Sequence, residues 1–120
     1  MNVTLWLMLF FFTKHFVIDF LLQMKYQYSN KGTYGHPGGL LHAGLHGVGT
    51  AICLIMFPWE SILFLAGFDA VMHYHIDWAK VNINSRMGWG PTTHEQFWWL
   101  LGLDQTLHLL TYVAIIAMVI

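Results

Sequence analysis

Residues 94–120 read HEQFWWLLGLDQTLHLLTYVAIIAMVI, and this stretch decides the fold class. After Glu95, the one charged residue in the stretch is Asp104. The hydrocarbon core of a bilayer is about 30 Å thick, so a helix needs about 20 mostly apolar residues to cross it. The stretch therefore predicts a transmembrane helix that carries Asp104 and His108 one turn apart on the same face.

Three more stretches have a similar character, at residues 3–24, 40–57 and 60–80. They are separated by polar connectors at residues 25–39 and 81–93 and by a tight turn at Pro58, since proline is a poor residue for continuing a helix. Four apolar segments with short connectors predict an all-α polytopic membrane protein, an antiparallel bundle of four transmembrane helices. We expect a single domain over residues 1–120, because this length suits one compact unit.

The composition also favours lipid over water as the surroundings of the chain. Apolar residues make up 57% of the sequence and charged residues 9%, whereas a soluble domain has about 25% charged residues. The net charge of -1 provides no basic surface for nucleic acid. The first residues lack the positive charge and the cleavage site of a signal peptide, so we expect a retained first helix.

The cations predict an orientation in the membrane. Lys25 and Lys31 lie in the first polar connector, and Lys80 and Arg86 lie at the second. In a four-span protein both connectors fall on one side, which the positive-inside rule places in the cytoplasm. We therefore expect both termini outside the cytoplasm, with Lys14 as the one basic residue inside a span.

Each predicted helix contains two His or Asp residues four positions apart. The eight residues are His15, Asp19, His42, His46, His73, Asp77, Asp104 and His108. Side chains at this spacing share one helix face, and polar groups inside a membrane are costly unless they face partners. Most of the eight fall at a similar depth in the cytoplasmic half, so we predict that they converge on bound metal.

The charges of these residues suggest two metal ions. Asp19, Asp77 and Asp104 contribute -3 when ionised, and a dry interior does not accept that charge without compensation. Two divalent ions and one bridging hydroxide would bring the cluster close to neutral. Nitrogen and oxygen ligands suit zinc, iron or manganese.

Further polar residues lie on or near the same helix faces. We predict that Asp69 acts as a general base, although it could instead replace one of the ligands, and that Gln23 and Gln105 orient the cofactor's ligands. Two interpretations without metal stay open. The histidines could be hydrogen-bonded core residues, or the cluster could form a proton relay.

Four motifs in the chain resemble a family of small bacterial and phage membrane proteins known as a domain of unknown function. They are His15-x3-Asp19-Phe20-x2-Gln23, His42-x3-His46, His73-x3-Asp77-x2-Lys80 and Asp104-Gln105-x2-His108. The chain is also distantly similar to membrane-bound metal-dependent hydrolases, which implies a metal site. The resemblance implies a location in the inner membrane of a bacterium or of a phage-infected host.

Three functions compete at this point. The first is an intramembrane metal-dependent hydrolase with a dinuclear His/Asp centre, acting on a lipid or small-molecule substrate. The second is a metal or proton transporter, and the third is a non-catalytic phage or bacterial membrane modulator with a structural metal. The limited interior of a short bundle also makes a homo-oligomer plausible.

Overall fold

The computed structural model describes residues 2–120, and over that range every regular element is helical. The elements are α1 (Val3–Phe16), η1 (Val17–Leu21), α2 (Lys25–Tyr28), α3 (Pro37–Cys53), α4 (Trp59–Met87) and α5 (Glu95–Val119). The prediction of an all-α protein is confirmed. Element η1 continues α1 without a break and has the wider turn of a π-helix.

Local sequence signals explain where the helices begin and end. The Asn2 side chain accepts a hydrogen bond from the Leu5 amide at 3.0 Å and caps α1. His36 accepts one from the Gly38 amide at the start of α3, with Pro37 in the first turn. Gly88 has a φ of 67°, the left-handed conformation that ends α4.

Two predicted boundaries differ from the structure. Helix α4 runs on past Lys80 to Met87, so most of the expected connector at residues 81–93 is helical. The expected connector at residues 25–39 contains α2 and the first turn of α3. Polar residues do not stop a helix by themselves, and the first residue suited to ending α4 is Gly88.

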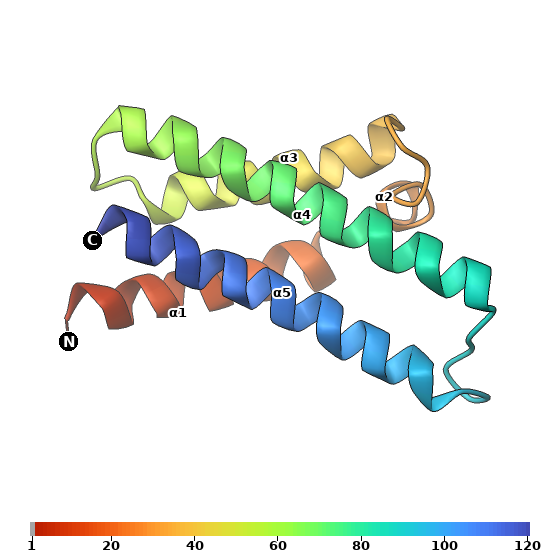
Figure 1. Ribbon diagram of the computed structural model, residues 1–120. Coiled ribbons are helices and arrows are strands. Elements are labelled where there is room, and N and C mark those ends of the chain that lie inside the picture. The colour runs from red at the N-terminus through yellow and green to blue at the C-terminus, as the bar shows by residue number, and fades with distance from the viewer. Residues whose placement is uncertain (1) are drawn as a thin grey trace.

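The long helices lie side by side as two pairs (Figure 1). Helix α3 packs on α4, α4 packs on α5, and α1 contacts both α3 and α5. The short α2 packs against the start of α3. Both termini lie at the same end of the molecule, and the α4–α5 connector lies at the opposite end (Figure 1).

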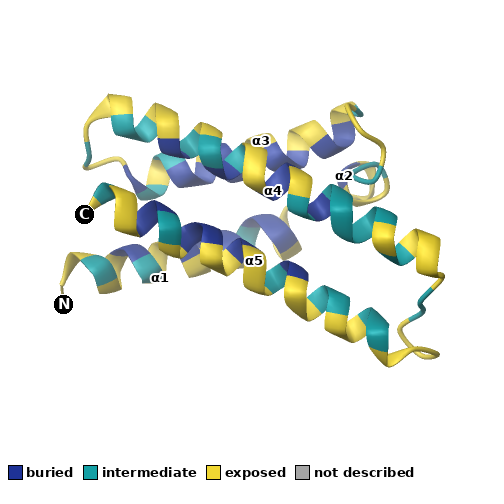
Figure 2. Ribbon diagram, viewed as in Figure 1, coloured by how far each residue is buried: buried dark blue, intermediate teal, exposed yellow. Residues whose placement is uncertain are grey.

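Two segments are long and apolar enough to cross a membrane, at Val3–Leu21 and Glu95–Val119. Apolar side chains are exposed along the outer faces of the helices, while the buried stripes face inward (Figure 2). Within residues 2–120, the buried set contains thirteen polar or charged residues and ten hydrophobic ones. The usual distribution of a soluble domain is therefore reversed.

The interior has an apolar part and a polar part. The apolar core consists of Leu7, Phe11, Leu54, Leu65, Tyr112, Ile115 and Ile116. These residues come from the halves of the long helices nearest the termini. The next turns toward the opposite end bring the buried His and Asp side chains together, so the apolar core seals one side of the polar cluster.

Candidate metal centre

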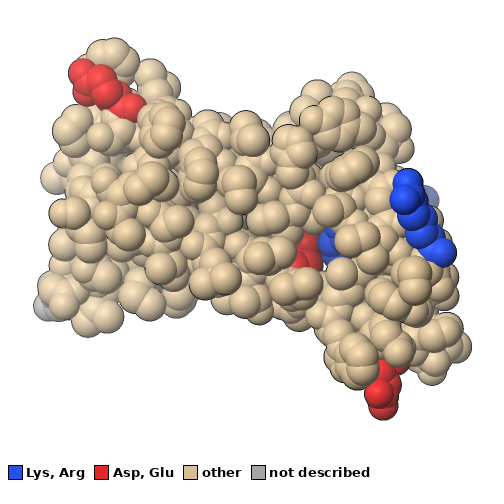
Figure 3. Space-filling model, viewed as in Figure 1, with Lys and Arg blue, Asp and Glu red and all other residues tan. Residues whose placement is uncertain are grey.

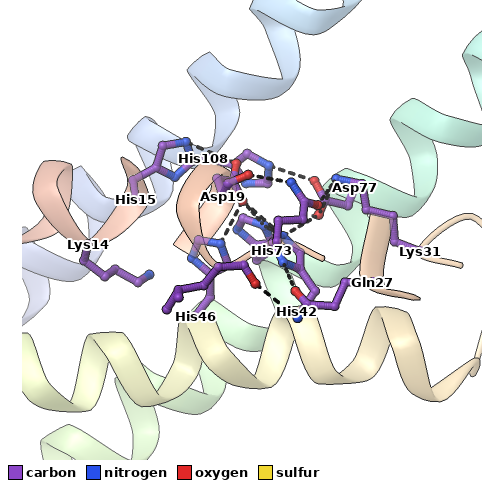
Figure 4. A network of polar contacts seen from close by, with 12 residues as sticks. Lys14, His15, Asp19, Gln27, Lys31, His42, His46, His73, Asp77 and His108 are labelled. Atoms are coloured by element: carbon purple, nitrogen blue, oxygen red, sulfur yellow. Dashed lines mark hydrogen bonds and ion pairs between the residues drawn. The ribbon is translucent and has the colours of Figure 1, made fainter. Parts of the chain in front are cut away.

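Four elements supply the residues that meet in the polar interior (Figure 4). Asp19 comes from η1, two histidines come from α3, and α4 and α5 each supply one aspartate and one histidine. A π-turn inside a helix is frequent at functional sites because it redirects a side chain that regular helix geometry would place elsewhere. Here the π-turn contains Asp19, which is 5% exposed.

The first group of ligand atoms forms around Asp19. It consists of Asp19, His42, His46 and His73, whose ligand atoms all lie within 4.8 Å of one another. The Oδ1 atom of Asp19 is 2.8 Å from Nε2 of His46, 3.0 Å from that of His42 and 3.3 Å from that of His73. All four side chains are buried, so the group offers three nitrogen atoms and one oxygen atom to a single ion.

The second group shares a histidine with the first. It consists of His73, Asp77 and His108. Asp77 Oδ1 lies 3.1 Å from His108 Nε2, and Asp77 Oδ2 lies 3.2 Å from His73 Nε2. Asp104 Oδ1 lies 3.5 Å from His108 Nε2. The two oxygens of Asp77 therefore face different histidines.

One short contact between nitrogens fits both a hydrogen bond and a shared ion. The Nε2 atoms of His42 and His73 are 3.1 Å apart. Two ligands bonded to one ion at about 2.0–2.1 Å lie about 2.8–3.4 Å from each other at the angles of common coordination geometries. The distances around Asp19 Oδ1 fall in the same range.

A glutamine outside the predicted set orients His42. The Nδ1 atom of His42 lies 3.1 Å from Gln27 Oε1, to which an Nδ1–H donates. Gln27 is itself fixed, because its amide donates to the Leu22 carbonyl at 3.2 Å. A proton on Nδ1 leaves the Nε2 lone pair free for an ion, which is how neighbouring groups prepare metal-binding histidines.

The structure places His15 beside the two groups and outside both. Its Nδ1 is 2.7 Å from the Tyr112 hydroxyl and its Nε2 is 2.6 Å from Gln105 Oε1. Nε2 is also 3.3 Å from Asp19 Oδ2. His15 therefore lies where it can hold Asp19 in position, and the predicted ligand role stays a prediction.

Both predicted glutamines contact the centre's carboxylate residues. Gln105 donates to Asp104 Oδ2 at 3.0 Å. Gln23 donates to the Asp19 backbone carbonyl at 2.5 Å and accepts from the Lys31 ammonium at 2.9 Å. These contacts suit residues that position ligands.

Asp69, the predicted general base, lies in a separate ion pair. Its Oδ2 accepts from Lys14 Nζ and from Thr50 Oγ1, each at 2.5 Å. The stem of Lys14 packs against Gly49, where a Cβ would meet Lys14 Cγ at 2.8 Å. Lys14, the basic residue that breaks the charge pattern of the sequence, thus has a buried partner that lies one helical turn before His73 on α4.

Sequence reasoning missed Lys31 and Gln27 because both lie in the stretch expected to be a plain connector. Lys31 extends from the segment between α2 and α3, and its Nζ is 3.4 Å from Asp77 Oδ2 (Figure 4). A cation and an amide next to a predicted carboxylate cluster could have marked these two residues as candidates. The sequence gave no indication of their contacts, because Lys31 is 46 residues from Asp77 along the chain.

The family described as "Protein of unknown function (DUF3307)" matches residues 7–120. This match covers nearly the whole chain and confirms the resemblance to a domain-of-unknown-function family. No curated protein and no solved structure matches the chain.

Proposed function

We propose that this chain, which belongs to the DUF3307 family, is an intramembrane metal-dependent hydrolase with a dinuclear His/Asp centre. The observation that carries the proposal is the two adjacent ligand groups, which meet at His73 inside a protein with an apolar exterior. The Nε2 lone pair of His73 would bind one of the two ions, and Asp77, with two oxygens, would contact both groups. The substrate bond that this arrangement suits best is a phosphate ester.

The distribution of side chains supports a four-span topology. Apolar residues such as Phe20, Leu63 and Val113 are more than half exposed on three different helices, and burying such surface in lipid removes it from water. The 17 residues of α3 reach about 25 Å at a rise of 1.5 Å per residue. Helix α4 is longer and keeps its central acidic residues buried.

The charges support the proposed orientation. Lysine and arginine atoms gather at the end of α4 away from the termini, where acidic atoms near the start of α5 are also visible, whereas at the other end of α4 the charged atoms in view are acidic (Figure 3). The positive-inside rule then puts the α4–α5 connector in the cytoplasm and both termini outside. The metal centre would lie in the cytoplasmic half.

Charge compensation supports metal over an empty polar core. Asp19, Asp77 and Asp104 are each at least 95% buried. Among residues 2–120, the ammonium group in contact with them is that of Lys31, since Lys14 is paired with Asp69. Divalent ions bound by the neighbouring histidines would remove the excess negative charge, which is strongly unfavourable in a membrane interior when it is not compensated.

Two ions held this way supply an activated water and a positive charge that stabilises the leaving oxygen. Asp77 would hold the two ligand groups at a fixed separation, and His15 would keep Asp19 in place. The oxygen of water forms a bond to phosphorus as the phosphorus–ester oxygen bond breaks. The leaving alcohol takes up a proton, so the products are an alcohol and inorganic phosphate.

The first experiment is elemental analysis of the detergent-purified protein together with turnover of a chromogenic phosphate ester. We expect about two zinc, iron or manganese ions per chain, and loss of both metal and turnover in His46→Ala. His94→Ala is the matched control, because His94 is exposed and bonds to its own connector. Full turnover in a folded His46→Ala protein would refute the hydrolase, and absence of metal after reconstitution would refute the centre.

A further inference from the structure

A groove between α4 and α5 reaches Asp104, which lies beside the second ligand group. Its cavity volume is about 260 Å³. Its lining residues are Met72, His75, Ile76, Ala79, Lys80, Ile83, Leu100, Leu103, Asp104 and Leu107. In Figure 1 the two helices separate toward their connector, and Figure 3 shows a hollow there with acidic and basic atoms at its bottom.

Asp104 connects the groove to the ligand groups. It is 4% exposed, it lines the groove, and its Oδ1 atom has no hydrogen-bond partner within residues 2–120. The same Oδ1 lies 3.5 Å from Nε2 of His108, which belongs to the second ligand group. A buried oxygen without a partner is costly, so its position indicates that a bound group completes the site here.

If the proposed function holds, the net charge of the centre with two metal ions bound favours an anionic ligand. Two divalent ions and the Lys31 ammonium contribute +5, and Asp19, Asp77, Asp104 and one hydroxide contribute -4, which leaves +1. A phosphate monoester carries close to two negative charges at neutral pH. Lys80 adds a further cation at the groove wall.

We infer that the substrate is a lipid phosphate monoester whose chain lies in the α4–α5 groove and whose phosphate binds at the metal centre. Apart from His75, Lys80 and Asp104, the lining residues are apolar. From Met72 to Ile83 the groove follows α4 for about 16 Å, at 1.5 Å per residue. In a membrane-spanning protein this face meets lipid, so an amphiphile reaches the centre laterally.

A second groove offers a matched control. It lies between α1, η1 and α3, has a cavity volume of about 760 Å³, and includes Lys14, Val48 and Ile52 in its lining. Neither groove is lined by a member of the ligand groups, but Asp104, whose Oδ1 lies 3.5 Å from His108 Nε2, lines the first groove and not this one. A chain bound in this larger groove would therefore not bring its phosphate to the metals.

The test measures binding of dodecylphosphonate, a lipid phosphate analogue that cannot be hydrolysed, to metal-loaded protein in phosphatidylcholine nanodiscs. Methylphosphonate has the same head group without the chain, and empty nanodiscs correct for partitioning. We expect saturable, metal-dependent binding of dodecylphosphonate at least about tenfold tighter than that of methylphosphonate. Leu103→Trp and Ala79→Phe fill the groove and should weaken it about tenfold or more, whereas Ile52→Trp in the other groove should not.

Each alternative result overturns the inference in a recognisable way. Equal affinity for the two phosphonates would assign the site to a soluble phosphate. Weakening by Ile52→Trp but not by the two α4–α5 variants would move the lipid to the other groove. No binding by protein that retains its metal would refute the lipid phosphate and leave the metal centre standing, whereas loss of the metal itself would refute the proposed function.

Discussion

The buried ion pair between Lys14 and Asp69 gives a prediction whose size follows from the structure. The two side chains are 5% and 1% exposed, their charged atoms are 2.5 Å apart, and Thr50 donates to the same carboxylate oxygen. Removing one partner leaves the other charge buried, which costs about 3–5 kcal/mol. We expect Lys14→Met and Asp69→Leu each to destabilise the protein by about that amount.

The double variant should behave differently from the sum of its parts. Lys14→Met/Asp69→Leu leaves no uncompensated charge, and replacing a buried ion pair with apolar residues is often close to neutral. We therefore expect a coupling of several kcal/mol between the two sites, which is larger than neighbouring residues usually show. The assay is thermal unfolding in detergent, followed by far-UV circular dichroism, for the wild type and the three variants.

The same double variant tests the assignment of Asp69 as general base. A stable, metal-loaded double variant that turns over phosphate ester would remove Asp69 from the chemistry and leave it a structural role. If the two single changes add in the double variant, Lys14 and Asp69 are not coupled and the reasoning from their contact is refuted.

Three further predictions test the packing, the orienting residues and the topology. Gly49→Ala should destabilise the protein by about 1–3 kcal/mol, because the added Cβ would meet Ile18 Cδ1 at 2.6 Å. Gly44→Ala in the same helix has open space around the added Cβ and should stabilise the protein by about 0.5–1 kcal/mol. Equal shifts of the thermal unfolding midpoint in the two variants would contradict the close packing at Gly49. Gln27→Ala should weaken metal binding about 10–100-fold in a chelator competition, and unchanged affinity would mean that Gln27 does not orient His42. In a cysteine-free background, Ser29→Cys should react with a membrane-impermeant maleimide only from the cytoplasmic side, and Glu60→Cys should react only from the other side. Labelling of both cysteines from the same side would refute the four-span topology.

The sequence alone determined the helical elements and the faces on which the polar residues lie. A helix repeats every 3.6 residues, so the spacing of His42 and His46 or of His73 and Asp77 places each pair on one face without knowledge of any neighbour. The high cost of burying such groups in an apolar protein then indicated that the faces meet. These inferences need only local geometry and composition.

The sequence also predicted that the pairs belong to one layer, and the structure brings all eight residues into one connected set of contacts, with His15 and Asp104 outside the two ligand groups. The sequence did not distinguish His15 from the members of the ligand groups, since His15 has the same spacing to Asp19 as the ligand pairs have within their helices. Its place was decided by Tyr112 and Gln105 on α5, which bind both ring nitrogens.

The tertiary structure alone decided which side chains meet across helices. The π-turn that aims Asp19 at three histidines, the reach of Lys31 to Asp77 and the pairing of Lys14 with Asp69 depend on how neighbouring helices are rotated and shifted. Those parameters follow from packing, such as the close approach at Gly49. The sequence pattern predicts which residues share a face of a helix. It does not predict which other helix packs on that face, because that contact joins residues far apart in the chain.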